Sequence, residues 1–128
     1  MNLTNPLPKI LVVDDDIPSS DVIRYFVKNV ALPDIVNNGP SAVSKAKENF
    51  YAAILMDINL GRGMNGLDTV REIRKIYGYE TTPVLALTAY AMAGDREKFL
   101  SSGCTHYLSK PFSKSELLKV LSEMIKID

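Results

Sequence analysis

Aspartate, threonine and lysine side chains follow four apolar runs of this chain, at the points where the runs stop. Asp14 and Asp15 follow the first run, Asp57 the second and Thr88 the third, and Lys110 comes just beyond the fourth. Carboxylates that share one site raise one another's pKa or require a counter-charge, which a metal ion or a lysine can supply. Oxygen ligands without histidine or cysteine favour a hard cation, and a few carboxylates with retained waters suit Mg²⁺.

Such a group of side chains can carry out phosphoryl chemistry. A carboxylate such as Asp57 can act as a nucleophile towards phosphorus and form an acyl phosphate. Mg²⁺ and the Lys110 ammonium group can neutralise phosphoryl oxygens during transfer, and the Thr88 hydroxyl can donate to the bound group. Aspartate is also common at strand ends and helix caps, and Asp16 is expected to be such a cap. The joint occurrence at four strand ends nevertheless favours a site.

Short apolar runs alternate with amphipathic segments along the whole chain, and these elements must position the polar residues. The expected strands are 10–13, 35–36, 52–56, 84–87 and 107–108. Helices are expected from about Pro18, Pro40, Leu67 and Met92, and a last one from the capping box Ser113–Glu116. The apolar stripe of the first helix is Val22, Ile23, Phe26, Val27 and Val30, and Leu67, Val70, Ile73, Arg74 and Tyr77 support the third helix.

This alternation predicts an α/β fold of the doubly wound (βα)5 type. Buried strands that alternate with helices imply a five-stranded parallel sheet covered on both faces. Right-handed crossovers leave few topologies, and the flavodoxin-like strand order 2-1-3-4-5 is common at this size. Ligands of such sheets bind at the carboxyl ends of the strands, near the switch between strands one and three. The polar residues named above all lie at that edge.

The composition excludes several classes of function. The chain has 128 residues, which suits one domain, and 46% of them are hydrophobic. The formal net charge is zero, which argues against a nucleic-acid binder, because such proteins usually carry a basic excess. No apolar run approaches the roughly 20 residues that cross a bilayer, so no membrane association is expected. Cys104 is the single cysteine and fits a reducing compartment, which predicts a cytoplasmic protein.

Four segments resemble the receiver domains of two-component response regulators, of the chemotaxis-regulator type. They are ILVVDDD (10–16), AAILMDINL (52–60), PVLALTAYA (83–91) and YLSKPF (107–112), in the family's order and at fitting spacing. The likeness covers residues 9–127, which leaves residues 1–8 as a leader. The stretch 88–104 is most similar to receivers of hybrid histidine kinases, so the chain is either a stand-alone protein or a receiver domain of a larger one.

The resemblance assigns a role to each candidate residue. Asp57 matches the phosphoacceptor, and Asp14 and Asp15 match the acidic pair that binds Mg²⁺ together with Asp57. The position of Asn59 supplies a further metal ligand through its backbone carbonyl. Lys110 matches the lysine that contacts the phosphoryl group, and its bond to Pro111 is usually cis in the family. Thr88 matches the switch hydroxyl, and Tyr107 the aromatic residue that swings inward on activation.

This chain differs from most receivers in the loop after Asp57, and two further positions vary within the family. Most receivers have a proline where Gly61 lies, and the loop is one residue longer here, so we expect this loop to be mobile without Mg²⁺ and partly ordered with it. Asn59 and Tyr90 match positions that tune the lifetime of the acyl phosphate. Tyr90 is bulky, and Tyr90→Ala is expected to shorten that lifetime by exposing Asp57 to water.

The resemblance implies a signalling switch rather than an enzyme. A sensor histidine kinase or a histidine phosphotransfer protein would donate the phosphoryl group to Asp57, and slow autodephosphorylation would follow. The new charge would draw Thr88 and Tyr107 inward and alter the face formed by the fourth helix, fifth strand and fifth helix, where a downstream partner binds. A homodimer formed on phosphorylation is a further expectation.

Two other functions stay open from the residues alone. Asp14-x-Asp16 after an apolar strand also resembles the first motif of haloacid-dehalogenase-type phosphatases, in which Asp14 would be the nucleophile. The chain is short for that family, and Asp57 would have no role. A degenerate receiver that only binds partners is the third reading, and the presence of every expected site residue argues against it.

Overall fold

Five parallel strands form a single sheet in the order β2-β1-β3-β4-β5, as the sequence predicts. The computed structural model describes residues 6–61, 63–89 and 95–125. The strands are β1 (Lys9–Val13), β2 (Leu32–Val36), β3 (Ala53–Asp57), β4 (Val84–Thr88) and β5 (His106–Ser109). The central strands β1, β3 and β4 consist almost wholly of buried residues, which is typical of a parallel sheet covered on both faces.

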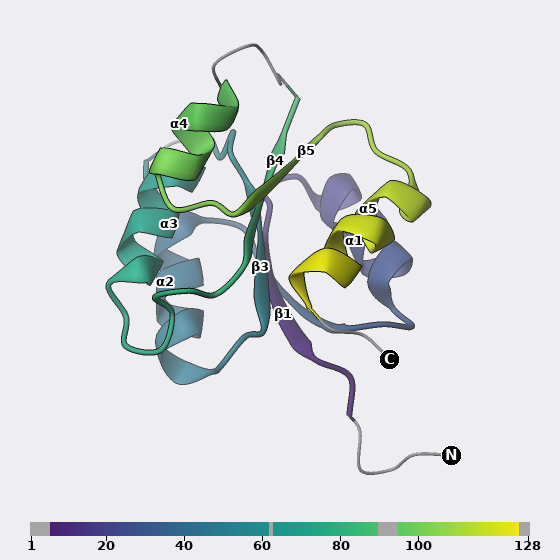
Figure 1. Ribbon diagram of the computed structural model, residues 1–128, viewed down its shortest axis with the longest axis horizontal. Coiled ribbons are helices and arrows are strands. Elements are labelled where there is room, and N and C mark those ends of the chain that lie inside the picture. The colour runs from purple at the N-terminus through teal and green to yellow at the C-terminus, as the bar shows by residue number, and fades with distance from the viewer. Residues whose placement is uncertain (1–5, 62, 90–94, 126–128) are drawn as a thin grey trace.

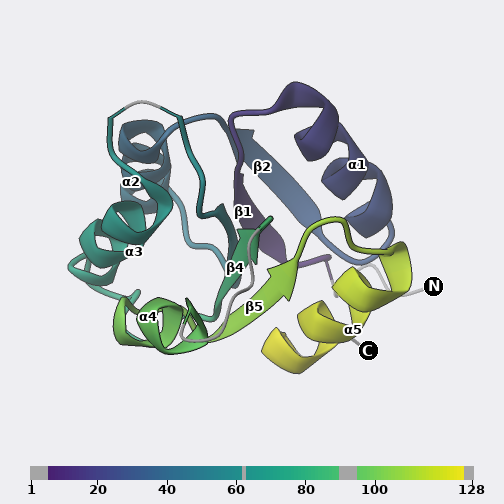
Figure 2. The ribbon, with the colours of Figure 1, turned by 90° about the horizontal axis from the view of Figure 1, so that it is seen from above.

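Helices cover both faces of the sheet (Figures 1 and 2). They are α1 (Ile17–Val27), α2 (Gly39–Glu48), α3 (Gly66–Arg74), α4 (Asp95–Ser101) and α5 (Lys114–Met124). Helices α1 and α5 lie on one side, and α2, α3 and α4 lie on the other, as the view from above shows (Figure 2). The architecture is therefore the doubly wound (βα)5 sandwich that the alternation of elements predicts.

Successive strand residues point to opposite faces and build two separate cores. Leu11, Val13, Ile54 and Met56 belong to the core under α2, α3 and α4. The residues between them, Ile10, Val12, Ala53 and Leu55, belong to the core under α1 and α5. Because both faces of the sheet are fixed by this packing, a one-residue slip of a strand would exchange its two faces. The register of the strand ends, and with it the position of the polar residues, is fixed in the same way.

Side-chain caps define where the helices begin. Asp16 caps α1 by accepting a hydrogen bond from the Ser19 amide at 2.9 Å, as expected from the sequence. Asn38 and Asn65 cap α2 and α3 in the same manner. Ser113 and Glu116 form the predicted capping box of α5, in which each side chain accepts from the other's backbone amide. These caps set the lengths of the loops that follow the strand ends.

Three local predictions were wrong. Strand β2 begins at Leu32 rather than Ile35, because it is an edge strand, where Pro33 and Asp34 are tolerated. Val22 is 47% exposed, since α1 buries a narrower stripe centred on Ile23 and Val27. Helix α3 ends at Arg74, so Tyr77 lies beyond it and is exposed.

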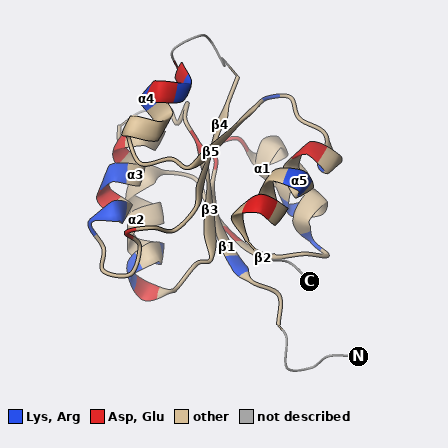
Figure 3. Ribbon diagram, viewed as in Figure 1, with Lys and Arg blue, Asp and Glu red and all other residues tan. Residues whose placement is uncertain are grey.

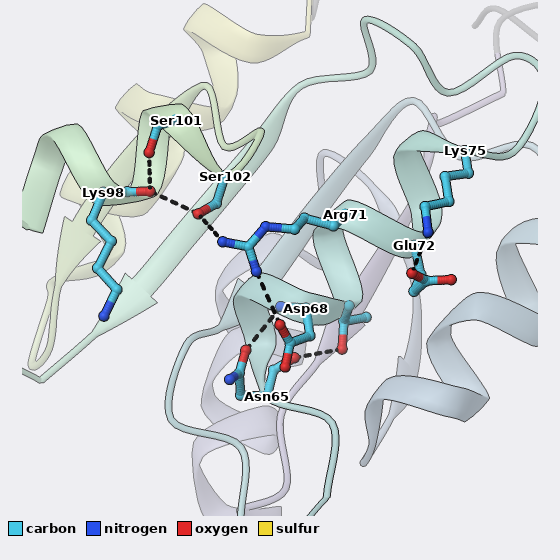
Figure 4. Close-up of polar contacts among 9 residues, drawn as sticks. Asn65, Asp68, Arg71, Glu72, Lys75, Lys98, Ser101 and Ser102 are labelled. Carbon is cyan, nitrogen blue, oxygen red and sulfur yellow. Dashed lines mark hydrogen bonds and ion pairs between the residues drawn. The ribbon is translucent and has the colours of Figure 1, made fainter.

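Two arginines of α3 hold the segment that follows α4. Arg71 donates to Asp68 Oδ1 at 2.9 Å and to Ser102 Oγ at 3.0 Å, and Figure 4 shows its guanidinium group between these two side chains. The Ser102 hydroxyl donates in turn to the Lys98 carbonyl. Arg74 donates to the carbonyl oxygens of Gly103 and Tyr79. The C-terminal end of α4 is therefore fastened to α3.

Charged residues of both signs are interspersed on the helices of both faces (Figure 3). The described residues contain no helix that is long and apolar enough to cross a membrane. Of the predicted boundaries, the start of the fourth helix at Met92, residues 1–5 of the leader and residues 126–127 lie outside the described residues.

Candidate functional site

Three carboxylates meet at the carboxyl edge of the sheet, between β1 and β3. Val13 and Met56 are partners in the register of these neighbouring strands, so Asp14 and Asp57 are the next residues along each strand. One oxygen atom from each of Asp14, Asp15 and Asp57 lies within 4.8 Å of the others. The structure thus brings together the acidic residues that the sequence predicts to share a site.

Asp14 is the most firmly held of the three. Its side chain has no exposed area, and its Oδ1 accepts from the Asp16 amide at 2.9 Å. Its Oδ2 accepts from the Ser19 hydroxyl at 2.6 Å. Ser19 was not predicted to belong to the site. Its position three residues after the Asp16 cap, on the turn that faces the strand end, is the signal that could have identified it.

Asp57 is buried, with 5% of its surface exposed, and its Oδ1 accepts from the Asn59 amide at 2.9 Å. Burial raises the pKa of Asp57 above its ordinary value, and the neighbouring Asp14 carboxylate acts in the same direction. The Asn59 amide and the Lys110 ammonium group oppose this rise in pKa. The charge of Asp57 is therefore costly in the folded protein, and a cation at the site would stabilise it.

Lys110 supplies the counter-charge that the sequence predicts. Its Nζ lies 3.5 Å from Asp14 Oδ2, 3.5 Å from Asp57 Oδ2 and 3.4 Å from Ser19 Oγ. The backbone of Lys110 donates to the Thr88 carbonyl at 2.7 Å, which holds the start of the β5–α5 loop against the end of β4. The bond from Lys110 to Pro111 is cis, as the resemblance implies.

Thr88 lies at the carboxyl end of β4, next to the end of β3. Asp57 and Leu87 are register partners in β3 and β4, so Thr88 is the residue that follows this pair at the same edge. Thr88 is 2% exposed. The structure therefore brings Thr88 to the same carboxyl edge as Asp57, one position beyond the register pair.

The loop after β3 completes the acidic edge. Asn59 is exposed, and its amide bonds Asp57 as described above. The Gly61 amide donates to Asp15 Oδ2 at 2.8 Å. Gly66 begins α3 directly against β3, and a Cβ atom there would overlap the Asp57 carbonyl oxygen. The contact of Gly61 was not predicted, because a backbone donor leaves no mark in the side-chain pattern.

Tyr107 and Tyr90 are the two remaining candidate residues. The Tyr107 side chain on β5 points outward and is 39% exposed, and the Arg96 guanidinium group of α4 lies 5.8 Å from its ring centre. Tyr90 lies outside the described residues.

An open groove leads to the Lys110 side of the site. It has a volume of about 420 Å³ and is lined by Ser19, Val22, Ala89, Lys110, Pro111 and Phe112. Lys110 and Ser19 also contact the Asp14 carboxylate, so the groove borders the acidic cluster. The groove therefore ends beside Lys110 and Ser19, and the exposed Asp15 is not among the residues that line it.

The donor set fits a hard divalent cation. All ligand atoms that the three aspartates offer are carboxylate oxygens, and they lie close enough together to share one ion. A few carboxylates at an open edge, where water can complete the coordination, suit Mg²⁺ better than a fully enclosed protein cage would.

Comparison with known proteins agrees with this geometry. The family model of the response regulator receiver domain matches residues 10–122. A hybrid signal transduction histidine kinase of Dictyostelium discoideum is 36% identical over 118 residues, which cover 89% of this chain and 3% of the kinase. The histidine kinase BarA of Escherichia coli is 34% identical, over 88% of this chain and 12% of the kinase. The chain thus spans a small part of these relatives. An uncharacterised 14.6 kDa protein of Leptolyngbya boryana is 32% identical over 89% of this chain and 87% of its own length.

Solved structures show the same fold. The receiver domain of a sensor histidine kinase from Pseudomonas aeruginosa, described with a magnesium ion coordinated in its active site cleft, is 36% identical with a TM-score of 0.86, over 94% of this chain and 99% of that one. The chemotaxis protein CheY4 of Vibrio cholerae has a TM-score of 0.88 and 27% identity, over 94% of this chain and all of that one. With the matched family model, the strand order and the acidic cluster in agreement, this chain belongs to the response regulator receiver domains of two-component signalling.

Proposed function

We propose that this receiver domain takes a phosphoryl group onto Asp57 in a reaction that depends on Mg²⁺. The donor is a phosphohistidine on a sensor kinase or a histidine phosphotransfer protein. The observation that carries the proposal is the convergence of three carboxylate oxygens within 4.8 Å, with the Lys110 ammonium group 3.5 Å from Asp57 Oδ2. Of the three aspartates, Asp57 is the one whose neighbours are the carboxylates that follow β1 on one side and Thr88 at the end of β4 on the other.

The transfer step forms one bond and breaks one. A carboxylate oxygen of Asp57 bonds to phosphorus while the phosphorus–nitrogen bond of the donor breaks, and the electron pair stays on the imidazole nitrogen, which takes up a proton. Lys110 stabilises the phosphoryl oxygens by its charge, and Thr88 donates its hydroxyl to one of them.

A bound Mg²⁺ would neutralise phosphoryl oxygens and hold the carboxylates together. Asp14, Asp15 and Asp57 would be its side-chain ligands, and the Asn59 carbonyl would be a backbone ligand. The magnesium ion in the related Pseudomonas aeruginosa receiver supports this assignment. Slow hydrolysis of the acyl phosphate would return Asp57 to its carboxylate, at a rate that Asn59 and Tyr90 would tune.

The signal would leave through the surface of α4, β5 and α5. Phosphorylation draws Thr88 and Tyr107 inward in this proposal, and a downstream partner or a second copy of the domain then binds the altered surface. The outward position of Tyr107 beside Arg96 supports it as the element that changes. Sedimentation of the phosphorylated domain measures dimerisation, and an unchanged monomer would exclude it.

Acetyl phosphate with Mg²⁺ tests the phosphoacceptor, with the intact mass of the protein as the readout. We expect one phosphoryl group per chain, its loss in Asp57→Asn, and its retention in Asp16→Asn, because asparagine preserves the cap of α1. Chelation of Mg²⁺ should abolish the modification. Full modification of Asp57→Asn would refute the assignment.

The same experiment separates the alternative functions. A phosphatase would turn over substrate and lose activity in Asp14→Ala. The structure speaks against Asp14 as a nucleophile, because both of its oxygens accept hydrogen bonds and its side chain has no exposed area. Failure to bind Mg²⁺ at millimolar concentration, together with absence of modification, would favour a receiver that only binds partners.

A further inference from the structure

The amide of Gly61 joins two loops that lie 46 residues apart in the chain. It donates to Asp15 Oδ2 at 2.8 Å and so connects the loop after β3 with the loop after β1. Both residues are exposed. The contact lies at the rim of the acidic cluster, because Asp15 contributes one of the three clustered oxygen atoms.

Asp14 and Asp15 are held by different means. The Asp14 carboxylate has no exposed area and is fixed by the Asp16 amide, the Ser19 hydroxyl and Lys110. Asp15 is exposed, and an exposed aspartate can rotate among several rotamers in water. The bond from the Gly61 amide fixes one of its oxygens in the orientation that the structure shows.

We propose that the Gly61 N–H group positions Asp15 for Mg²⁺, as an outer partner that orients a metal ligand. This inference rests on the proposed Mg²⁺ site. A ligating carboxylate is usually held by a hydrogen bond from outside the coordination shell, and loss of such a partner typically lowers metal affinity about 10- to 100-fold. Asp14 has such partners from its own loop and helix. Asp15 receives its partner from the other loop.

Glycine is suited to this task for a steric reason. A Cβ atom at position 61 would lie 3.0 Å from Asp15 Oδ2, the same oxygen that accepts the hydrogen bond. A side chain there would press on the carboxylate that the amide must hold. A proline would in addition remove the N–H group altogether. In this chain, position 61 thus combines an N–H donor with an α-carbon that leaves the Asp15 carboxylate undisturbed.

Two variants test the donor. Gly61→Pro removes the N–H group but also stiffens the loop. A semisynthetic protein in which an ester replaces the Leu60–Gly61 amide removes the N–H group and adds no bulk. Calorimetric titration with Mg²⁺ should give an affinity about 10-fold or more below the wild type for both. Circular dichroism spectra of both variants should first match that of the wild type, so that a loss of affinity is not a loss of fold.

A second readout shows whether Asp15 is the target of the donor. The proton resonance of the Gly61 amide should lie further upfield in the Asp15→Asn variant than in the wild type. The reason is that a neutral amide oxygen is a weaker acceptor than a carboxylate. Gly61→Pro should then weaken Mg²⁺ binding much less in the Asp15→Asn background than in the wild type.

The outcomes separate the inference from the proposed function. If the wild type binds no Mg²⁺ at millimolar concentration, the proposed metal site fails and the inference falls with it. If the wild type binds Mg²⁺ and the ester variant binds it equally well, the inference alone is overturned. Equal losses for Gly61→Pro in both backgrounds would also overturn it, since the effect would not pass through the Asp15 carboxylate.

Discussion

The Ser19 hydroxyl donates to Asp14 Oδ2 at 2.6 Å, so the first turn of α1 supplies a donor to the end of β1. Lys110 approaches the same two side chains, with its Nζ 3.5 Å from Asp14 Oδ2 and 3.4 Å from Ser19 Oγ. Ser19 therefore belongs to the site although it is neither a metal ligand nor charged. It keeps the buried Asp14 carboxylate in one orientation.

Ser19→Ala should lower the free energy of unfolding by about 1.5–3 kcal/mol, the usual worth of a hydrogen bond to a charged group. The buried Asp14 carboxylate would lose one of its partners. Urea denaturation measures the change. Ser122→Ala is the matched control, because the exposed Ser122 hydroxyl bonds only the Lys119 carbonyl on the helix surface and its loss should cost little. Equal effects of the two changes would contradict the role of Ser19.

Asp57→Asn should raise the free energy of unfolding at neutral pH. Burial and Asp14 raise the pKa of Asp57 above its ordinary value of 3.8. Between these two pKa values the unfolded chain binds fewer protons than the folded protein, so stability falls as the pH rises through that window. The neutral asparagine removes this loss and can still accept from the Asn59 amide. Denaturation without Mg²⁺ at several pH values should show a gain at pH 7 that shrinks below pH 4. A less stable variant at pH 7 would disprove this.

Arg96→Ala should shift Tyr107 towards the inward position that we propose for the phosphorylated state. The Arg96 guanidinium group lies 5.8 Å from the ring centre of the outward Tyr107. An exposed contact of a cation with an aromatic ring is worth about 0.5–1 kcal/mol, which corresponds to an approximately two- to fivefold change in the ratio of the two positions. Carbon-13 labelled tyrosine rings report this ratio by NMR. Arg96→Lys keeps a cation there and should have a smaller effect, and an unchanged Tyr107 signal in Arg96→Ala would refute the contact's role.

Cys104 should react slowly with thiol reagents in the folded protein. Burial raises the pKa of its thiol to about 11, from an ordinary value of 9.0. Because only the thiolate reacts, this rise alone leaves about 100-fold less reactive sulfur at pH 8. The same shift should lower stability as the pH rises from about 9 towards 11, where the unfolded chain loses the proton first. Iodoacetamide labelling with and without urea gives the ratio of the reaction rates in the unfolded and folded protein. Equal rates would contradict the prediction, since they would show that the folded thiol is accessible.

The sequence predicts the sheet and most of the site because buried strands end abruptly at polar residues. Asp14, Asp57 and Thr88 directly follow the apolar residues of their strands, so parallel pairing alone brings them to one edge. Ser19 and Gly61 could not be predicted in this way. Ser19 acts through the geometry of a helix turn, and Gly61 through a backbone donor that any residue except proline possesses.

The wrong predictions for Val22, Tyr77 and strand β2 arise because sequence spacing does not show the limits of an element or of its buried face. Helical spacing predicts that Val22 and Tyr77 lie on buried faces, but spacing alone does not say how wide the buried face is or where the helix ends. Gly78, at φ 98°, turns the chain after α3, and Tyr79 enters the core in place of Tyr77. Strand β2 extends over Pro33 because a sheet edge demands no further hydrogen bond there.

The attachment of Ser102 to Arg71 defines the kind of motion that α4 can make. A helix of seven residues is about 10 Å long, and here one end is bound to its neighbour. Its displacement would therefore be a rotation about the C-terminal end, with an amplitude that grows towards Asp95. Arg96 lies near the N-terminal end of α4, opposite the attached end. A small rotation of the helix would therefore displace the guanidinium group beside Tyr107 more than it displaces the residues near Ser102.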